Sequence, residues 1–130
     1  MFNTPGIKKE LATAVGQILF NVQHQMSVGI KLGKTSNAAQ DIGGRKIVKA
    51  GTPLNGDLKA RTTAFVKAVD STNPAVGVLL HDVDVTDADA NGTLLIFGFV
   101  NLDRLDDTTA GLITSTRETE LAGKVWFLKD

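Results

Sequence analysis

The chain has 130 residues, no cysteine, and 14 basic residues balanced by 14 acidic ones. This length suits one domain, and the absence of cysteine excludes a disulfide framework and thiol chemistry. The apolar runs are far shorter than the ~20 residues of a membrane-spanning helix, and we find no secretory pattern of a basic, an apolar and a small-residue region. We therefore expect no membrane partner and assembly in a reducing cytosol.

The zero net charge hides an uneven distribution. Residues 1–69 carry ten basic and three acidic side chains, a net charge of +7, and residues 70–130 carry four basic and eleven acidic ones, a net charge of −7. Such asymmetry can steer association with a charged partner or with a second copy of the chain. The plainer interpretation is that the two halves fold back against each other, because surface charges are screened beyond roughly 8–10 Å.

The N-terminal residues 1–26 are expected to form an arm outside a β domain that spans residues 27–130. Apolar side chains at helical spacing form one stripe, which consists of Leu11, Val15, Ile18, Leu19, Val22 and Met26. Gly16 and the β-branched residues weaken a helix, and Ile18, Phe20 and Val22 also fit the alternation of a strand. A stripe exposed on a free monomer would be a liability, so we expect it to pack on a neighbouring molecule or on its own domain.

Short β-type segments separated by turns follow along the chain. Alternating apolar residues predict a strand over 27–32, and the polar, glycine-rich residues 33–44 predict a loop. Further strands are expected over 45–50, 64–69 and 124–129, with turns at Asn55-Gly56 and Asn73-Pro74. One helical turn is expected over 102–107 with Asn101 as its N-cap, followed by a polar connection over 108–120. This pattern predicts a small single-domain, all-β barrel or sandwich with at most short helical turns.

A hairpin is expected between residues 75 and 105. Two apolar runs flank an acidic stretch, and Asn91-Gly92 predicts a type I′ turn because both residues tolerate a positive φ. The return strand over 94–100 is almost wholly apolar, so both of its faces should be covered. The residues expected to pack across this hairpin are Val76, Val78, Leu80, Leu95, Phe97 and Phe99.

Three segments carry a resemblance to a known family. They are Val48-Lys-Ala-Gly-Thr-Pro-Leu54, Ala75-Val-Gly-Val-Leu-Leu-His-Asp-Val-Asp-Val85 and Gly98-Phe-Val-Asn-Leu-Asp-Arg-Leu105. Together they resemble the lambda-type head decoration proteins of tailed bacteriophages, over residues 47–105. The resemblance implies a β-tulip-like domain that acts as a structural cement protein rather than an enzyme.

The resemblance also implies partners and a location. Decoration proteins of this kind assemble in the host cytoplasm, often as homotrimers, and sit on the outer surface of the mature head, where they bind the major capsid protein. This chain departs from the lambda-type members in its long N-terminal stretch. On physical grounds we take the basic, apolar-striped arm as the capsid contact, with the candidates Lys8, Lys9, Leu11, Val15, Ile18, Leu19 and Val22.

An acidic stretch imitates a metal site. Asp87, Asp89, Asn91 and Gly92 match the start of a calcium-binding loop, D-x-[DN]-x-[DN]-G. Such a loop needs a bidentate Glu at its twelfth position, where this chain has Gly98, and too few oxygen ligands remain. We therefore expect an acidic turn and no metal site.

A second segment imitates a phosphate-binding loop. Gly29-Ile-Lys-Leu-Gly-Lys-Thr35 has three residues between its glycines where the loop needs four, and no helix pattern follows it. His81 and Asp82 form no dyad, because neighbours on a strand point to opposite faces. No Ser/His/Asp arrangement can be assembled. We expect no cofactor and no catalytic residue.

The alternative to a decoration protein is a β-barrel module that binds single-stranded nucleic acid or carbohydrate. Its distinguishing feature would be an exposed aromatic platform. Most of the aromatic residues lie in apolar runs that we expect to be buried, and the basic residues of the first half lack interleaved aromatics. Nucleic acid is therefore not the expected partner.

Overall fold

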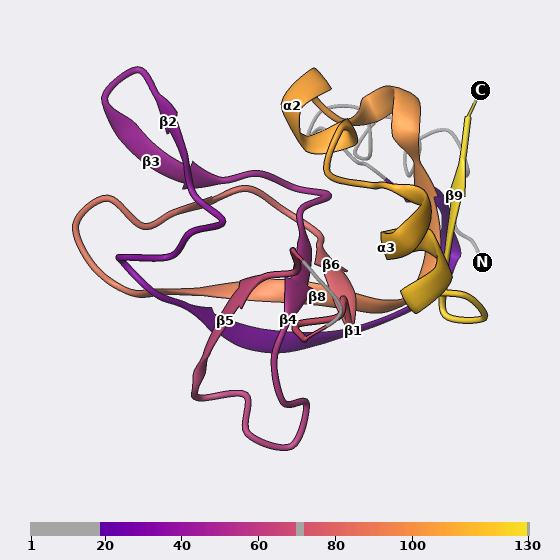
Figure 1. Ribbon diagram of the computed structural model, residues 1–130, viewed down its shortest axis with the longest axis horizontal. Coiled ribbons are helices and arrows are strands. Elements are labelled where there is room, and N and C mark those ends of the chain that lie inside the picture. The colour runs from indigo at the N-terminus through magenta and orange to yellow at the C-terminus, as the bar shows by residue number, and fades with distance from the viewer. Residues whose placement is uncertain (1–18, 70–71, 130) are drawn as a thin grey trace.

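The computed structural model describes residues 19–69 and 72–129, with the backbone alone for residues 19–24 (Figure 1). Its strands are β1 Leu19–Leu32, β2 Gln40–Ile42, β3 Arg45–Val48, β4 Pro53–Asn55, β5 Ala64–Lys67, β6 Gly77–Leu79, β7 Val83–Asp84, β8 Ala90–Asn101 and β9 Val125–Leu128. The helical elements are the 3₁₀ turn η1 Leu102–Arg104, α2 Asp107–Ala110 and α3 Ser115–Glu120. The expectation of an all-β fold with short helical turns is confirmed. Within the described residues, no helix has the length and apolar character that a membrane span requires.

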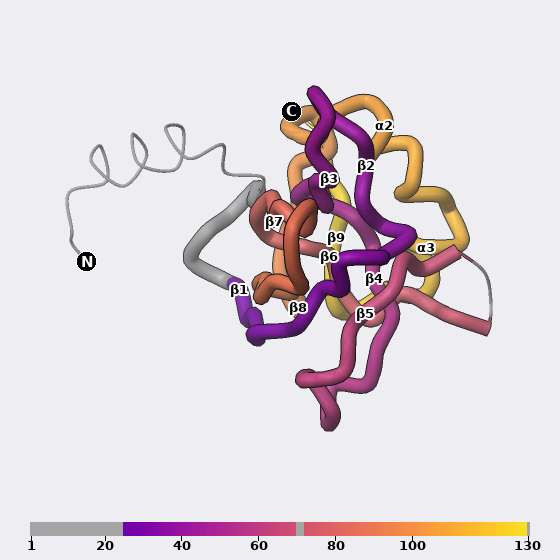
Figure 2. The backbone as a smooth tube through the Cα atoms, turned by 90° about the vertical axis from the view of Figure 1, so that its left-hand side faces the viewer, coloured from indigo at the N-terminus to yellow at the C-terminus, as the bar shows by residue number. Residues whose placement is uncertain are grey.

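Five strands pair in a closed ring. Strands β5, β4, β6 and β8 pair antiparallel in that order, and β1 closes the ring by pairing antiparallel with β8 and parallel with β5. Closure leaves few strand edges free for unwanted pairing. Strand β9 adds to β8 in parallel, and β2, β3 and β7 form a separate small sheet. The β2–β3 hairpin and the β4–β5 loop project at opposite sides of the body (Figure 2).

Two apolar clusters form the core, one on each face of β8. Leu94 belongs to a cluster that fills the ring, and its neighbour Leu95 belongs to a cluster beneath the helices and β9. Successive residues of a strand point to opposite faces, so this one strand serves both clusters. The expectation that residues 94–100 are covered on both faces is met at Leu94, Leu95 and Val100, which are fully buried.

Two of the three segments that carry the family resemblance lie side by side in the ring, and the third, residues 98–105, begins in the part of β8 that pairs with β9. Pro53 pairs with Val78 and Leu79 pairs with Leu94, which joins β4, β6 and β8 in order. Gly51, at φ +96°, donates its N–H to the Leu79 carbonyl at 2.7 Å. A Cβ on Gly51 would approach the Leu105 side chain to 2.5 Å, so a larger residue would strain both backbone and packing.

The predicted turn at Asn91-Gly92 is wrong. Both residues lie inside β8, where they pair with Lys31 and Ile30 of β1. Residues 85–89 make the turn instead, and the long partner of β8 is β1 rather than the preceding strand. Gly92 is needed for close packing, because a Cβ there would come within 3.0 Å of Leu79.

The predicted boundary between arm and domain at residue 26 falls inside β1. This strand begins at Leu19, which pairs with Val100, and Asn21 pairs with Phe99. Pairing with β8 therefore extends the expected strand over 27–32 toward the N-terminus, in agreement with the alternative alternation of residues 18–22. The remainder of the expected arm, residues 1–18, lies outside the described residues.

Two segments expected to be irregular contain regular elements. The expected loop over 33–44 contains β2, which turns into β3 at Gly43 and Gly44, both with positive φ. The expected polar connection over 108–120 contains α2 and α3, whose N-caps are the side chains of Asp106 and Thr114. The N-cap predicted at Asn101 is confirmed, because its side chain accepts the Asp103 N–H at 2.9 Å.

The expected hairpin core is confirmed only in part. Val78, Leu80 and Leu95 are buried in one cluster, whereas the side chain of Phe97 is 40% exposed. Among the side chains that the structure describes, the largest fully buried one is Phe65, at 1% exposure, in the cluster that fills the ring.

A matched pair of truncations tests this assignment. Phe65→Ala should lower the free energy of unfolding by about 3–5 kcal/mol, because it leaves a cavity in the ring. Phe97→Ala should lower it by about 1 kcal/mol, the scale of one aromatic pair. Urea denaturation of both variants provides the measurement, and equal losses would contradict the burial assignment.

Candidate functional site

Exposed apolar side chains gather where β1, β8 and β9 meet. The stacked rings are Trp126 of β9 and Phe99 of β8, which are register partners, with centroids 5.0 Å apart and planes at 19°. Phe97 meets Trp126 edge-on at 5.5 Å. We call this surface the apolar ledge; it consists of Met26, Phe97, Phe99, Trp126 and Leu128.

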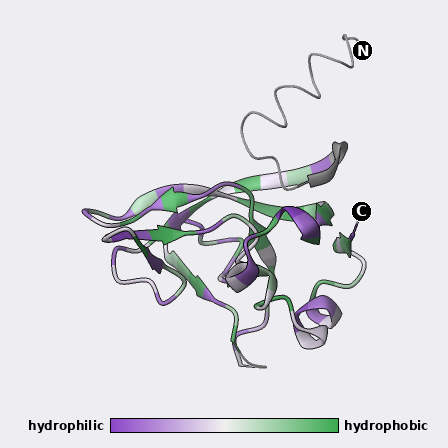
Figure 3. Ribbon diagram, turned by 90° about the horizontal axis from the view of Figure 1, so that it is seen from above, coloured by the Kyte–Doolittle hydropathy of each residue, from purple (hydrophilic) through white to green (hydrophobic). Residues whose placement is uncertain are grey.

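The apolar ledge is open to solvent within the described part of the chain. Met26 is 60% exposed, and Trp126 and Leu128 are each 38% exposed. The ends of β8 and β9 beside the C-terminus are coloured as hydrophobic in Figure 3. The expectation that most aromatic residues are buried is therefore wrong for Phe97 and Trp126. Large apolar side chains that are exposed together mark contact surfaces more often than isolated ones do.

The N-terminal segment enters the domain beside the ledge. Leu19 pairs with Val100, directly after the ledge residue Phe99, and Met26 pairs with Phe97. Of the seven predicted capsid contacts, Leu19 and Val22 therefore lie in β1. The other five, Lys8, Lys9, Leu11, Val15 and Ile18, lie outside the described residues.

At the other end of β8, the charges of the two halves of the chain meet. Arg45 pairs with Asp84 at 2.8 Å and with Asp87 at 3.5 Å. Two further ion pairs join a lysine of the first half to an aspartate of the second: Lys49 with Asp82 at 2.9 Å and Lys31 with Asp89 at 3.5 Å. The interpretation that the halves fold back against each other is confirmed. For Arg45 the small sheet explains the contact, because β3 pairs with β7, which contains Asp84.

The carboxylates of the acidic stretch bind groups of the same chain. Asp89 accepts the Lys34 backbone N–H at 2.7 Å, which lowers the pKa of this carboxyl, and Asp82 accepts the Ala50 N–H at 2.7 Å. Across residues 19–69 and 72–129, no three His, Asp or Glu side chains are grouped as a metal site would require. The carboxylates of this turn serve to fasten the loop.

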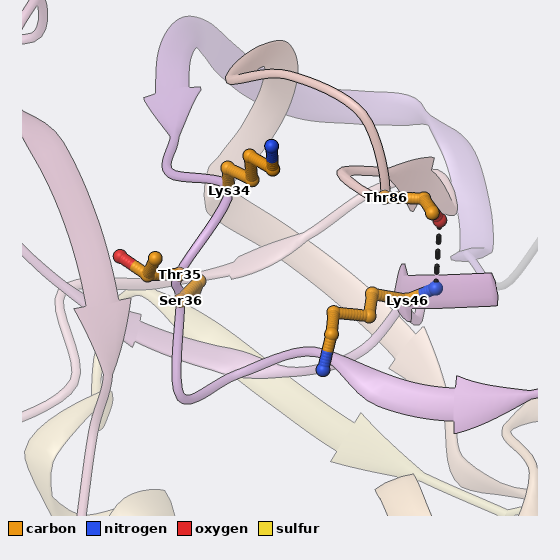
Figure 4. Close-up of a pocket in the computed structure, with 5 residues that line it drawn as sticks. All are labelled: Lys34, Thr35, Ser36, Lys46 and Thr86. Atoms are coloured by element: carbon orange, nitrogen blue, oxygen red, sulfur yellow. Dashed lines mark hydrogen bonds between the residues drawn. The ribbon is translucent and has the colours of Figure 1, made fainter. Parts of the chain in front are cut away.

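A polar cavity of about 360 Å³ lies beside this turn (Figure 4). Three segments that are distant in sequence line it: the loop after β1, strand β3 and the loop before β8. The lining residues are Lys34, Thr35, Ser36, Lys46 and Thr86. The sequence pointed to Lys34 and Thr35 through the imitation of a phosphate loop. It did not point to Lys46 or Thr86, which only the tertiary fold brings there.

One ion pair inside the domain is buried. Arg117 of α3 is 4% exposed and donates to Glu120 at 3.1 Å, while the second carboxylate oxygen of Glu120 accepts the Ala75 N–H at 2.8 Å. This contact fastens α3 to the chain before β6. It is enclosed by the core, so its role is structural.

Comparison with known proteins gives no match, either to a protein-family model or to a curated protein.

The anchoring of the acidic turn can be tested by titration. The Thr86 hydroxyl and N–H, and then the Arg45 guanidinium, hold the pKa of Asp84 at about 2, below its ordinary value of 3.8. A depressed carboxyl pKa stabilises the fold above the unfolded value, and this stability is lost as the pH falls from about 4 through about 2. Carboxyl NMR should give a midpoint near 2 for Asp84, and Thr86→Val and Arg45→Gln should each raise it. A midpoint at the ordinary value in the parent protein would contradict the hydrogen bonds.

Proposed function

We propose that this chain is a structural decoration protein of a tailed bacteriophage, which binds the major capsid protein on the outer surface of the mature head and stabilises it. The observation that carries the proposal is the resemblance over residues 47–105. Its first two segments contain β4 and β6, which pair with each other, and β6 pairs in turn with Leu94 and Leu95 of β8. Its third segment, residues 98–105, contains the end of β8, which pairs with β9. Proteins that share such segments would be expected to share the sheet that these segments build.

The apolar ledge supports the proposal as a contact surface. Burial of apolar area contributes about 25 cal/mol per Å², less the cost of ordering the groups involved. The ledge is built on three paired strands, and Trp126 is held by two neighbouring rings, so little side-chain entropy is lost on contact. The N-terminal segment, with its basic residues and apolar stripe, would reach the shell from the same end of the domain.

Stabilisation of the head would follow from mass action. A protein that binds only the assembled shell lowers the free energy of that state at every occupied site. Modest contacts repeated over many sites therefore raise the stability of the whole head. As a homotrimer, the state that the resemblance implies, each particle would join several capsid subunits.

A second candidate is the binding module for single-stranded nucleic acid or carbohydrate. The exposed rings of Phe97 and Trp126 favour it, because they supply the aromatic platform that this function requires. Base stacking on such rings contributes roughly 1–3 kcal/mol per base.

Substitutions on the ledge test the first proposal. Trp126→Ser and Phe97→Ser should each weaken binding to expanded heads at least tenfold, about 1.4 kcal/mol, because they remove apolar contact area. Sedimentation with heads that lack their own decoration protein gives the measurement. Ile42→Ser is the matched control, since Ile42 is an equally exposed apolar residue, at 43%, on the distant β2–β3 hairpin. Equal binding by all three folded variants would exclude the ledge as the contact.

Removal of residues 1–18 tests the arm. Since β1 begins at Leu19, this truncation keeps the sheet intact, and the shortened chain should show an unchanged β-type circular dichroism spectrum. Its affinity for expanded heads should fall at least tenfold, about 1.4 kcal/mol. If the truncated chain is folded and binds heads with unchanged affinity, residues 1–18 do not contribute to the contact.

The only tryptophan of the chain lies in the ledge, so its fluorescence separates the two candidates. A decoration protein should show a change in Trp126 emission with heads and none with oligothymidine or soluble oligosaccharides. Saturable quenching by either small ligand, with no response to heads, would favour the binding module.

A further inference from the structure

Two hydrogen bonds join the segments that line the polar cavity beside the acidic turn. Lys34 donates its backbone N–H to Asp89 at 2.7 Å, and Lys46 donates its backbone N–H to the Thr86 hydroxyl at 2.8 Å. Both acceptors belong to the loop between β7 and β8. The two lysines are thus fastened to one loop although they lie on different segments, as Figure 4 shows for Lys46 and Thr86.

The charged groups of this cavity are the ammonium groups of its two lysines. Neither Lys34 nor Lys46 forms an ion pair with a described residue, whereas the neighbouring bases Lys31, Arg45 and Lys49 all do. The nearby aspartates are engaged by those bases and do not line the cavity. Both ammonium groups belong to residues that line the cavity, and they extend in different directions in Figure 4. The Asp89 carboxylate, which accepts the Lys34 N–H, also attracts the Lys34 ammonium group.

The remaining polar groups of the cavity offer hydrogen-bond donors. The Ser36 hydroxyl accepts the Ala38 N–H at 3.1 Å, which leaves its own hydrogen free to be donated. The Thr86 hydroxyl is already committed, since it accepts from Lys46 and donates to Asp84, so it positions the site rather than binding a ligand. Ammonium and hydroxyl donors together match an anion that has several acceptor oxygens.

We propose that this cavity, lined by Lys34, Ser36 and Lys46, binds a phosphate group, either as the free ion or on a small phosphomonoester. Its volume of about 360 Å³ lies at the lower end of the range for small-molecule sites and leaves room for an organic group beside the phosphate. No aromatic residue lines it, so the stacking surface that single-stranded nucleic acid requires is lacking. The site lies at the opposite end of β8 from the ledge and does not depend on the proposed capsid function.

Its chemistry differs from that of a phosphate-binding loop. Gly33, Lys34 and Thr35 are followed by a turn and strand β2 rather than by a helix. The phosphate would therefore be held by side-chain ammonium groups and not by a helix N-terminus. Such a site depends on Coulomb attraction, so its affinity should fall as the salt concentration rises.

Amide NMR of the full chain at low salt tests the site directly. Inorganic phosphate should produce saturable shifts centred on the amides of residues 34–36 and 46, with a Kd on the order of 1 mM. Lys34→Gln and Lys46→Gln should each weaken binding at least threefold without changing the rest of the spectrum. Lys59→Gln is the matched control, because Lys59 is an exposed lysine that lines a separate basic hollow with Lys31 and Arg61; its affinity should be unchanged.

A parallel titration with glycerol 3-phosphate identifies the source of the phosphate group. Tighter binding of the ester supports the site and indicates a phosphomonoester, and equal or weaker binding supports it as a site for the free ion. Shifts that do not saturate, or that sodium chloride of equal ionic strength reproduces, would overturn the proposal. An equal loss of affinity in Lys59→Gln would overturn it as well, because attraction would then be spread over the basic surface.

Discussion

The whole structure depends on the pairing of strand β8 along both of its edges. One edge carries β1 over nearly its full length, and the other carries β6 and then β9 in succession. Around its middle both faces of β8 are also covered, because Leu94 and Leu95 belong to different apolar clusters. A single strand thus closes the ring, holds the C-terminal strand and separates the two parts of the core.

The parts of the fold that depend on near neighbours in the sequence could be predicted. Short β-type segments between turns predicted β3, β5 and β9, and the cap at Asn101 followed from one side chain beside one turn. The choice of pairing partner could not be predicted. Asn91-Gly92 is locally well suited to a turn, yet the long contact with β1 contributes more than one favourable turn and keeps both residues in a strand. The start of β1 lies earlier than residue 27 because its pairing with β8 continues there, and the sequence left this open, since residues 18–22 fit either a helix or a strand.

Prediction of the candidate surfaces failed where exposure depends on the arrangement of layers. Phe97 belongs to an apolar run that indicates burial, but the face of β8 that it shares with Trp126 has no covering layer among the described residues. The polar cavity shows the same limitation. A short local pattern in the sequence indicates Lys34, whereas Lys46 lines the cavity only because the β2–β3 hairpin folds back toward the turn before β8.

One end of β8 is surrounded by charged residues and the other by exposed apolar ones. This difference indicates which parts of the chain would contact a shell and which would only support the fold. At the Ala90 end, most charges of the two halves neutralise one another and fasten the acidic turn. At the Asn101 end, three residues of the exposed ledge, Met26, Trp126 and Leu128, belong to strands outside residues 47–105. The segments that carry the resemblance therefore supply the scaffold, and strands from outside it supply much of the exposed contact surface. If the proposed function holds, fold and shell specificity can vary independently, since changes in β9 or at the start of β1 would alter the contact without disturbing the central pairing of β4, β6 and β8.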